Sequence, residues 1–240
     1  MLLAKQAGIL AGISLIQTVI QEESDSMRLH AECHEGTTLE NGRVIGVLTG
    51  PVRRILELER TLLNYLQRTS GIATRTRQFV EAVTGNGCRI LDTRKTMPGL
   101  RYLDKWAVRI GGGENHRAGL YDMVLLKENH LRMAGGISAA VQAARAIHGT
   151  TLEIEVEVTS LAELEEALSL QVDRIMLDNF GLEQTRQAVA RTASRVPLEA
   201  SGNMTLERVA DVAATGVDFI SVGALTHSVA ALDISLLFDA

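Results

Sequence analysis

Residues 152–158 read Leu-Glu-Ile-Glu-Val-Glu-Val, an alternation of apolar and acidic side chains that is typical of a β-strand. Because successive side chains of a strand point to opposite faces, three carboxylates share one face and four apolar side chains share the other. Burial of unpaired carboxylates is costly, so we expect the acidic face to meet cations, a metal ion or a polyhydroxyl ligand. The alternative is an edge strand whose acidic face lies in water.

Similar short apolar runs recur at intervals of about one βα unit. They are residues 89–92, 122–127, 173–178, 197–201 and 218–222. Helical patterns lie between several of them, and the one that begins at Ser160 has Glu163 in the position of a capping box. This alternation predicts a parallel α/β sheet, and the number of units favours closure into a barrel over an open doubly wound sheet. No Gly-x-Gly-x-x-Gly follows a strand, which argues against a dinucleotide fold.

The first part of the chain has a different pattern. Residues 28–33 and 43–49 read as the strands of a hairpin, and residues 9–20 predict a core helix or a strand followed by a helix. A long helical stripe follows, and Ser70-Gly71 predicts its interruption before a second helix. The predicted divisions are residues 1–70 (an α/β domain), 71–227 (the barrel) and 228–240 (a tail able to rejoin the first domain).

The 240 residues have an ordinary globular composition, with 46% hydrophobic residues, 3% aromatic residues and a formal net charge of −5. The few aromatic side chains and the lack of a broad basic face argue against nucleic-acid binding. No apolar run reaches the ~20 residues of a membrane span. Cys33 and Cys88 lack zinc-like spacing, so we expect buried thiols in a reducing compartment, the cytoplasm, with a disulfide as the alternative.

Residues 89–130 carry an excess of positive charge. They contain eight Lys or Arg residues and five Asp or Glu residues, within a chain that is acidic as a whole. Because buried unpaired cations are costly, this segment predicts a small polyanionic ligand. Charged and polar residues at predicted strand ends place the site at the carboxyl edge of the barrel, where barrel enzymes keep their sites. They are Lys95, Lys127, Asp178, Glu199 and Ser201.

Three further features are typical of anion or metal binding. Arg94 and Arg117 can each hold a carboxylate through two parallel hydrogen bonds, and Arg117 follows a flexible Gly-Gly-Gly run. Small residues at 200–203 and 221–227 allow backbone N–H groups to approach a phosphate. An oxygen-rich set suits Mg²⁺ held partly by a substrate phosphate, namely Glu155, Glu157 and Asp178.

The chain resembles the quinolinate phosphoribosyltransferases, the decarboxylating nicotinate-nucleotide pyrophosphorylases of NAD biosynthesis. Three motifs carry most of the resemblance: Asp92-Thr93-Arg94-Lys95-Thr96, residues 111–117 and residues 127–130. The other matching segments are residues 59–61, 70–74, 98–101, 155–158, 177–179, 199–203 and 221–227. The resemblance implies an incomplete parallel α/β barrel of the TIM type with a smaller N-terminal α/β sandwich domain.

The resemblance also implies substrates and residue roles. Quinolinate and phosphoribosyl pyrophosphate are the implied substrates, with Mg²⁺ as the metal and nicotinate mononucleotide, pyrophosphate and carbon dioxide as products. The residues implied around quinolinate are Arg94, Lys95, His116, Arg117 and Lys127, with Arg60 reaching into a partner subunit's site. Glu157 and Asp178 are implied at the ribose and, indirectly, at the metal-bound diphosphate. The 5′-phosphate set is Ser201, Gly202, Gly223 and His227. The remaining substrate-binding residues are Thr93, Asn203, Val222 and Ala224. The implied catalytic residues are Lys95, Lys127, Glu157 and Asp178.

The chain departs from the family pattern in two places. It starts almost directly at the first strand, where family members carry a further helical segment, and Met97 stands where the family commonly has a second Thr. The first departure makes a non-catalytic anion-binding or assembly homologue the alternative function. A phosphoribosyltransferase acting on nicotinate or another small acid is the third hypothesis. The resemblance implies a homodimer with shared active sites, with a hexamer as the alternative.

Overall fold

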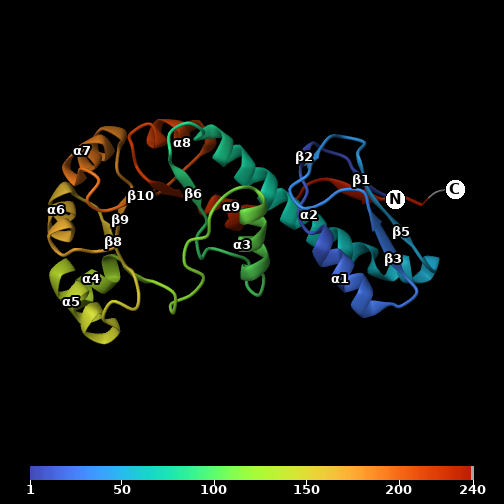
Figure 1. The fold of residues 1–240 in the computed structure, drawn as a ribbon, viewed down its shortest axis with the longest axis horizontal. Helices are drawn as coiled ribbons and strands as arrows, with labels where there is room; N and C mark the ends of the chain where they lie inside the picture. The colour runs from blue at the N-terminus through green and yellow to red at the C-terminus, as the bar shows by residue number, and fades with distance from the viewer. Residues whose placement is uncertain (239–240) are drawn as a thin grey trace. The chain divides into compact units, whose positions relative to one another are not determined.

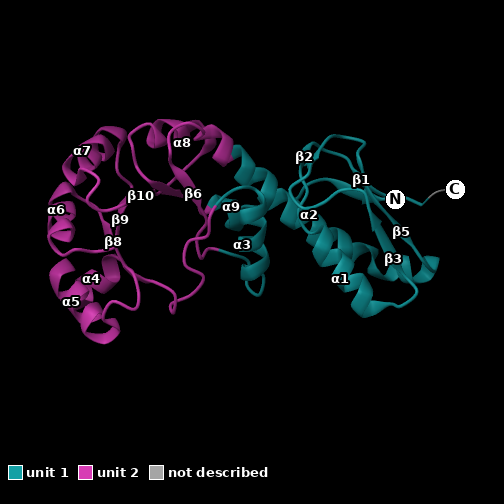
Figure 2. Cartoon of the chain, in the orientation of Figure 1, with its two compact units in different colours: residues 1–78, 96–113, 224–240 teal, residues 79–95, 114–223 magenta. Residues whose placement is uncertain are grey.

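The computed structural model describes residues 1–238, so the last two residues of the predicted tail 228–240 lie outside the described part. The chain divides into two compact units (Figure 2). Unit 1 comprises residues 1–78, 96–113 and 224–240, and unit 2 comprises residues 79–95 and 114–223. The expected boundary after residue 70 therefore falls within the first segment of unit 1.

An antiparallel four-stranded sheet forms one layer of unit 1 (Figure 1). In spatial order its strands are β12 (Ile234–Leu236), β1 (Leu2–Ala4), β5 (Val44–Thr49) and β3 (Arg28–Ala31). The antiparallel pairing of β3 with β5 confirms the expected hairpin. The connection between them contains β4 (Thr38–Leu39), which pairs with β2 (Gly8–Ile9) in a separate small sheet. Strand β12 brings part of the C-terminal tail against β1.

Helix α1 (Ile13–Glu23) packs an apolar stripe into the core of unit 1. Its buried residues, Ile13, Ile16 and Ile20, recur at the three- and four-residue spacing that places side chains on one helix face. They belong to a cluster that includes Ile45 of β5 and Leu66. The strand and helix predicted over residues 9–20 are confirmed as β2 and α1. Two further helices of this unit are α3 (Arg101–Ile110) and α9 (Ala224–His227).

Helix α2 runs without a break from Val52 to Ala82, so the predicted interruption at Ser70-Gly71 is wrong. These small residues allow close packing instead. Ser70 Oγ donates to the carbonyl oxygen of Ala11 and accepts from its N–H, in both cases at 3.0 Å. A Cβ on Gly71 would lie 2.1 Å from the carbonyl oxygen of Ala230. A neighbouring backbone segment, and not a turn, therefore requires glycine here.

Gly71→Ala is expected to lower the free energy of unfolding by about 1–3 kcal/mol, the usual cost of overpacking, although alanine favours a helix by about 1 kcal/mol. Gly181→Ala is the matched control, because no atom lies within 4 Å of a Cβ built at that position. Chemical denaturation of both variants measures the difference. Equal stabilities would show that the backbone near Ala230 moves away without cost.

Six parallel strands form the sheet of unit 2, and they confirm the six predicted strands. In spatial order they are β6 (Arg89–Leu91), β11 (Phe219–Ser221), β10 (Leu198–Ser201), β9 (Arg174–Asp178), β8 (Ile154–Val158) and β7 (Val124–Leu126). The helices between them are α4 (Glu128–Ala134), α5 (Ile137–His148), α6 (Leu161–Ser169), α7 (Leu182–Thr192) and α8 (Leu206–Ala213).

The sheet of unit 2 curves without closing. Strands β6 and β7 lie at its two ends, and among the described residues they do not pair with each other. Helices α6, α7 and α8 follow the outside of the curve (Figure 1), whereas a doubly wound sheet carries helices on both faces. Strand β8 pairs with β7 on one side and β9 on the other, so the edge-strand alternative for residues 152–158 is wrong. The unit is the expected incomplete parallel α/β barrel.

The two cysteines are buried and unpaired, as expected, and the disulfide alternative is wrong. Burial, followed by the negative charge of Asp218, raises the pKa of the Cys88 thiol to about 12, so this thiol stays protonated at neutral pH. Among residues 1–238, no helix combines the length and the apolar character that crossing a membrane requires.

Candidate active site

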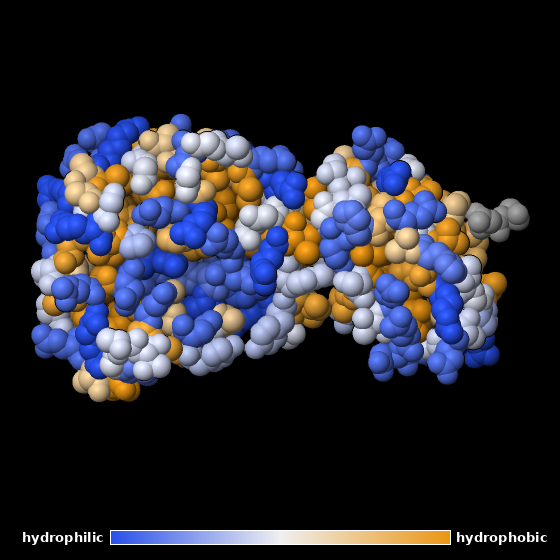
Figure 3. Space-filling model, viewed as in Figure 1, coloured by the Kyte–Doolittle hydropathy of each residue, from blue (hydrophilic) through white to orange (hydrophobic). Residues whose placement is uncertain are grey.

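The inner face of the barrel sheet is polar at two levels. Side chains two residues apart on a strand face the same side, and the strand register pairs Glu155 with Arg174 and Glu199 with Met176. At the carboxyl edge of the sheet, Ser201 pairs with Asp178. Figure 3 shows hydrophilic side chains gathered over the middle of unit 2. The strands therefore present charged groups both at the barrel mouth and one layer below it.

A pocket of about 450 Å³ opens at the carboxyl ends of the strands, and we call it the basic pocket because four cations line it: Arg94, Lys95, Arg117 and Lys127. Seven of the predicted site residues meet here, these four together with Thr93, His116 and Ser201. The remaining lining residues are Leu120, Leu125, His130, Met176, Glu199 and Ser221.

Lys127 directly follows β7, and two other chain segments bring the remaining three cations to the strand ends. Residues 93–95 follow β6, and Thr93 Oγ1 accepts a hydrogen bond from the Lys95 N–H at 3.1 Å. Residues 114–117 return beside β6, where the Glu114 N–H donates to the Ile90 carbonyl oxygen at 2.8 Å. This return places Arg117 over the sheet interior, although it is distant from β6 in the sequence.

Like charges meet in the basic pocket. Burial and then the positive charge of Arg94 lower the pKa of Arg117, and the Arg117 Nη1 donates to the carbonyl oxygen of Met123 at 3.1 Å. Guanidinium groups remain protonated even when their pKa is lowered, so Arg94 and Arg117 repel each other in the free protein. A ligand with two carboxylates would relieve this repulsion while accepting bidentate hydrogen bonds.

A buried ionic cluster lies at the floor of the basic pocket, and we define it as His116, Glu155, Arg174 and Glu199. His116 Nε2 lies 3.0 Å from Glu155 Oε2 and 3.4 Å from Glu199 Oε2. Arg174 Nη1 lies 3.3 Å from the same oxygen of Glu199. Both carboxylates are fully buried, and the His116 side chain is 5% exposed. Glu155, which the sequence places in the oxygen-rich set for Mg²⁺, thus lies in an ion-paired cluster with His116.

The ionic cluster retains one proton well above neutral pH. Burial lowers the pKa of His116, but its contacts with Glu155 and Glu199 outweigh burial and raise that pKa to about 9. Burial and the charge of Glu199 also raise the pKa of Glu155, while His116, Ser221 and Arg174 outweigh burial and lower the pKa of Glu199. His116 Nδ1 accepts the Arg117 N–H at 2.7 Å, which favours the proton on Glu155. Whether the proton lies on His116 or on Glu155, the four charges of the cluster sum to zero.

This proton predicts a pH dependence of stability. The native cluster retains it up to about pH 9, whereas an unfolded histidine releases it near pH 6.5. The contribution of this proton to the free energy of unfolding is therefore fully present below about pH 6.5. It is expected to fall by roughly 3 kcal/mol as the pH rises to about 9. Denaturant titrations of the wild type and His116→Asn across this range measure the effect. An equal pH slope in both proteins would show that Glu155 retains the proton without any contribution from His116.

Glu157 and Asp178 occupy the carboxyl edge of adjacent strands, as predicted. The Lys127 ammonium forms an ion pair with Glu157, whose side chain is 12% exposed. Asp178 Oδ2 accepts from Asn179 Nδ2 at 2.8 Å and is partly exposed. Both carboxylates therefore remain accessible at the barrel mouth, unlike Glu155 and Glu199 one layer below.

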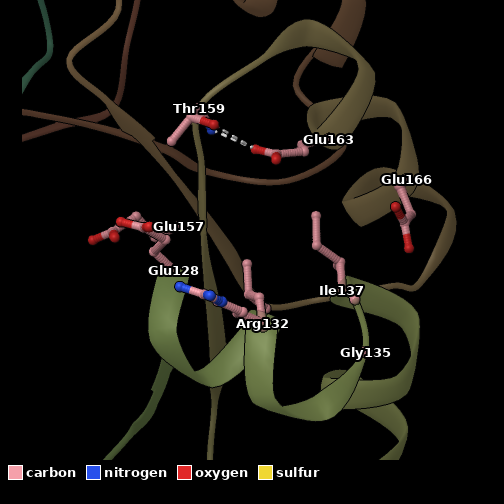
Figure 4. Close-up of a pocket in the computed structure, with 10 residues that line it drawn as sticks. Glu128, Arg132, Gly135, Ile137, Glu157, Thr159, Glu163 and Glu166 are labelled. Carbon is pink, nitrogen blue, oxygen red and sulfur yellow. Dashed lines mark hydrogen bonds between the residues drawn. The ribbon is translucent and has the colours of Figure 1, made fainter.

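A second cavity, of about 320 Å³, has Glu157 among its lining residues (Figure 4). It is lined by acidic residues of α4 and α6, and Arg132 extends toward Glu128 and Glu157. The Glu163 side chain accepts from the Thr159 N–H at 2.6 Å, and the Glu163 N–H donates to Ser160 Oγ. The predicted cap at Ser160 is thus present, with its return bond one residue earlier than a capping box requires.

The predicted phosphate-binding residues follow β10 and β11. Gly202 has a φ of +101°, and a Cβ there would lie 2.1 Å from Asn179 Oδ1, so glycine is required by both backbone and space. Val222 is buried and donates its N–H to the Leu91 carbonyl oxygen at 2.9 Å. Asn203 and Gly223 follow the two strands in unit 2.

Three predicted residues belong to unit 1, namely Ala224 and His227 of α9 and the exposed Arg60 of α2.

Arg174 is the member of the ionic cluster that the sequence does not place at the site. The sequence places Glu199 near a strand end and Glu155 on the inner face, but it does not show that both meet His116. Arg174 was not singled out, although it lies on the same strand face as Asp178. That two-residue spacing is a signal that could have identified Arg174 and Met176 as inward-facing.

Family models match both parts of the chain. The model described as "Quinolinate phosphoribosyl transferase, N-terminal domain" matches residues 1–70, and the C-terminal domain model of the same family matches residues 72–237.

Similar proteins occur in plants and bacteria. A "Quinolinate phosphoribosyltransferase [decarboxylating] 1b" from Nicotiana tabacum is 43% identical over 255 residues, covering 99% of this chain and 72% of the relative. A "Probable nicotinate-nucleotide pyrophosphorylase [carboxylating]" from Bacillus subtilis is 44% identical, covering 98% and 81%. The crystal structure of NadC from Streptococcus pyogenes has a TM-score of 0.94 at 42% identity, covering 98% and 83%. The predicted enzyme class is confirmed, and the chain belongs to the quinolinate phosphoribosyltransferase family.

Proposed function

We propose that this chain transfers the phosphoribosyl group of phosphoribosyl pyrophosphate to quinolinate, with loss of carbon dioxide, and that the basic pocket holds quinolinate. The observation that supports this placement most directly is the proximity of Arg94 and Arg117 in a pocket that also contains Lys95 and Lys127. Two carboxylates on one small ring require such a concentration of cations. A single carboxylate would contact fewer of these four cations.

The carboxyl edge of β8 and β9 supplies the groups for phosphoribosyl transfer. Positive charge develops at the anomeric carbon as pyrophosphate departs, and Glu157 and Asp178 can stabilise it electrostatically. Lys127, already paired with Glu157, can neutralise part of the leaving group. The backbone at Gly202 and Gly223, with Ser201, is assigned to the 5′-phosphate because small residues after two adjacent strands expose N–H groups.

Mg²⁺ is the metal that these residues fit. Glu157 and Asp178 offer accessible carboxylate oxygens from adjacent strands, and Mg²⁺ is commonly held by one or two carboxylates together with substrate phosphates. His116, Glu155 and Glu199 also lie close enough to share a metal ion, but they are buried below the barrel mouth, and Glu199 already pairs with Arg174. When bound, Mg²⁺ would supply charge neutralisation of the diphosphate.

The second chemical step needs positioning more than acid–base catalysis. Once the pyridine nitrogen has attacked the ribose, the ring is quaternised and stabilises the electron pair left on the adjacent carbon when its carboxylate leaves as carbon dioxide. A proton from solvent then completes the C–H bond at that carbon. Arg94 and Arg117 would orient the carboxylates, and Leu120 and Leu125 supply apolar contacts that exclude water from the ring. No single acid–base residue need be essential.

The test is an assay of nicotinate mononucleotide and carbon dioxide formed from quinolinate, phosphoribosyl pyrophosphate and Mg²⁺, alongside calorimetry of quinolinate binding. Equal yields of both products are expected. Nucleotide formation from nicotinate without carbon dioxide would favour the related phosphoribosyltransferase. Quinolinate binding without turnover would favour the non-catalytic homologue.

We assign the active oligomer to a homodimer in which Arg60 enters the partner's site, with a hexamer as the alternative. Arg60 is exposed on α2, which leaves it available to a partner. Mixing Arg60→Ala with Arg117→Ala should restore one intact site in each mixed dimer, because that site combines a wild-type pocket with a wild-type Arg60. Activity of the mixture above that of either variant alone checks this. No gain on mixing would argue that each subunit works with its own Arg60.

We assign the protein to the cytoplasm. Its two unpaired thiols support a reducing compartment. Fractionation of cells that express the native chain would test this assignment.

A further inference from the structure

Three members of the ionic cluster, Glu155, Arg174 and Glu199, have no role in the proposed reaction. The cluster's two carboxylates are buried directly beneath a pocket that would hold a dianion, where they would oppose ligand binding unless His116 and Arg174 balanced their charge. Glu155 and Arg174 are not among the residues that line the basic pocket within the described part of the chain. A buried ion-pair network is a weak source of stability. The cluster is therefore better explained by the way it positions neighbouring residues than by a contribution to stability.

Both ring nitrogens of His116 are engaged within the protein. Nδ1 accepts the Arg117 N–H at 2.7 Å, and Nε2 faces Glu155 and Glu199. The Asp92 carboxylate accepts the His116 N–H at 2.9 Å. With its side chain 5% exposed, His116 is better placed to hold its neighbours than to donate a hydrogen bond to a ligand.

A continuous set of contacts connects the lower layer of the barrel to the basic pocket. It begins at Arg174, which lies over the Phe219 ring with 4.3 Å between the guanidinium carbon and the ring centroid. Arg174 pairs with Glu199, and the Oε2 atoms of Glu199 and Glu155 lie 3.4 Å and 3.0 Å from His116 Nε2. His116 Nδ1 in turn accepts the backbone N–H of Arg117. Fixing the Arg117 backbone limits the directions that its guanidinium can take in the pocket.

We propose that Glu155, Glu199 and Arg174 are positioning residues that set the place of Arg117 through His116, and so determine the affinity for the acceptor. The inference rests on the proposed assignment of the basic pocket to quinolinate. Because fixed side chains lose less conformational entropy on binding, a rigid Arg117 binds a carboxylate more tightly than a mobile one.

Glu199→Gln separates this role from simple electrostatics. The substitution removes a negative charge beside the pocket, so the field alone would tighten binding of a dianion. Positioning predicts the opposite, namely a quinolinate dissociation constant at least about tenfold higher with the affinity for phosphoribosyl pyrophosphate within about twofold. Saturating quinolinate should restore most of kcat, because the reacting groups remain in place.

Arg174→Met is the second variant, because it removes the charge at the far end of the contacts while retaining side-chain length. It should weaken quinolinate binding in the same selective way. Glu153→Gln is the matched control, since this exposed residue precedes β8 and lies outside the cluster. Thermal unfolding of each variant, measured in parallel, identifies any that fail to fold.

Each outcome bears on the inference. Unchanged or tighter quinolinate binding in folded Glu199→Gln and Arg174→Met, or an equal loss of both substrate affinities, would overturn it. If Arg117→Ala loses quinolinate while these variants do not, only the positioning role fails. If the wild type does not bind quinolinate, the proposed function fails instead.

Discussion

Arg117→Ala is expected to weaken quinolinate binding by about a hundredfold, while the affinity for phosphoribosyl pyrophosphate changes by less than about threefold. Loss of one charge-assisted bidentate contact in a desolvated pocket corresponds to about 3 kcal/mol. The affinity for the second substrate is retained because Glu157, Asp178 and the residues after β10 and β11 are unchanged. Isothermal calorimetry with each substrate alone measures both constants.

Arg186→Ala is the matched control for Arg117→Ala. Arg186 belongs to the same unit and forms an exposed ion pair with Glu183, with 3.6 Å between Nη1 and Oε2. Its removal lowers the net charge of the unit by the same amount and should leave both affinities unchanged. An equal loss of both affinities in Arg117→Ala would show that the residue supports the fold of the site and does not bind the acceptor.

Glu157→Gln is expected to lower kcat by about a hundredfold or more, with quinolinate affinity nearly unchanged. A preorganised charge aimed at the reacting centre typically contributes 10²–10³ in rate. The neutral amide retains the shape of Glu157 but cannot stabilise the developing positive charge, and it leaves the Lys127 ammonium without its ion-pair partner. Steady-state kinetics at saturating concentrations of both substrates measure the loss.

Glu153→Gln again provides the control, because the residue lies on the same face of the alternating run but is exposed. Its kcat should match the wild type. A Glu157→Gln enzyme with normal kcat would remove Glu157 from the catalytic set. A large loss of quinolinate affinity would instead move it to acceptor binding.

The strands of the barrel could be predicted from the sequence because each is a short apolar run followed by a helical pattern. All six predicted runs contain a strand of the sheet. The error at Ser70-Gly71 has a physical cause, since small residues interrupt a helix in isolation but also permit close contact between backbones. Only the position of Ala230, far along the chain, distinguishes the two cases.

Residues at strand ends could also be predicted, because parallel strands bring their carboxyl ends to one edge. That reasoning identified Lys95, Lys127, Asp178 and Ser201 before any contact was known. The ionic cluster could not be predicted, since it depends on the return of residues 114–117 beside β6 and on the pairing of distant strands. Sequence spacing does not encode which inward-facing carboxylate meets which cation.

The zero net charge of the ionic cluster has a kinetic consequence. Because the charges of Glu155 and Glu199 are balanced internally, the cations above them project a nearly undiminished positive potential from a chain whose overall charge is −5. A positive opening in a negative surface concentrates field lines and guides anions toward it. Capture of a dianionic substrate should therefore be fast at low ionic strength and slow as salt screens the opening, even where the equilibrium contacts in the pocket are unaltered.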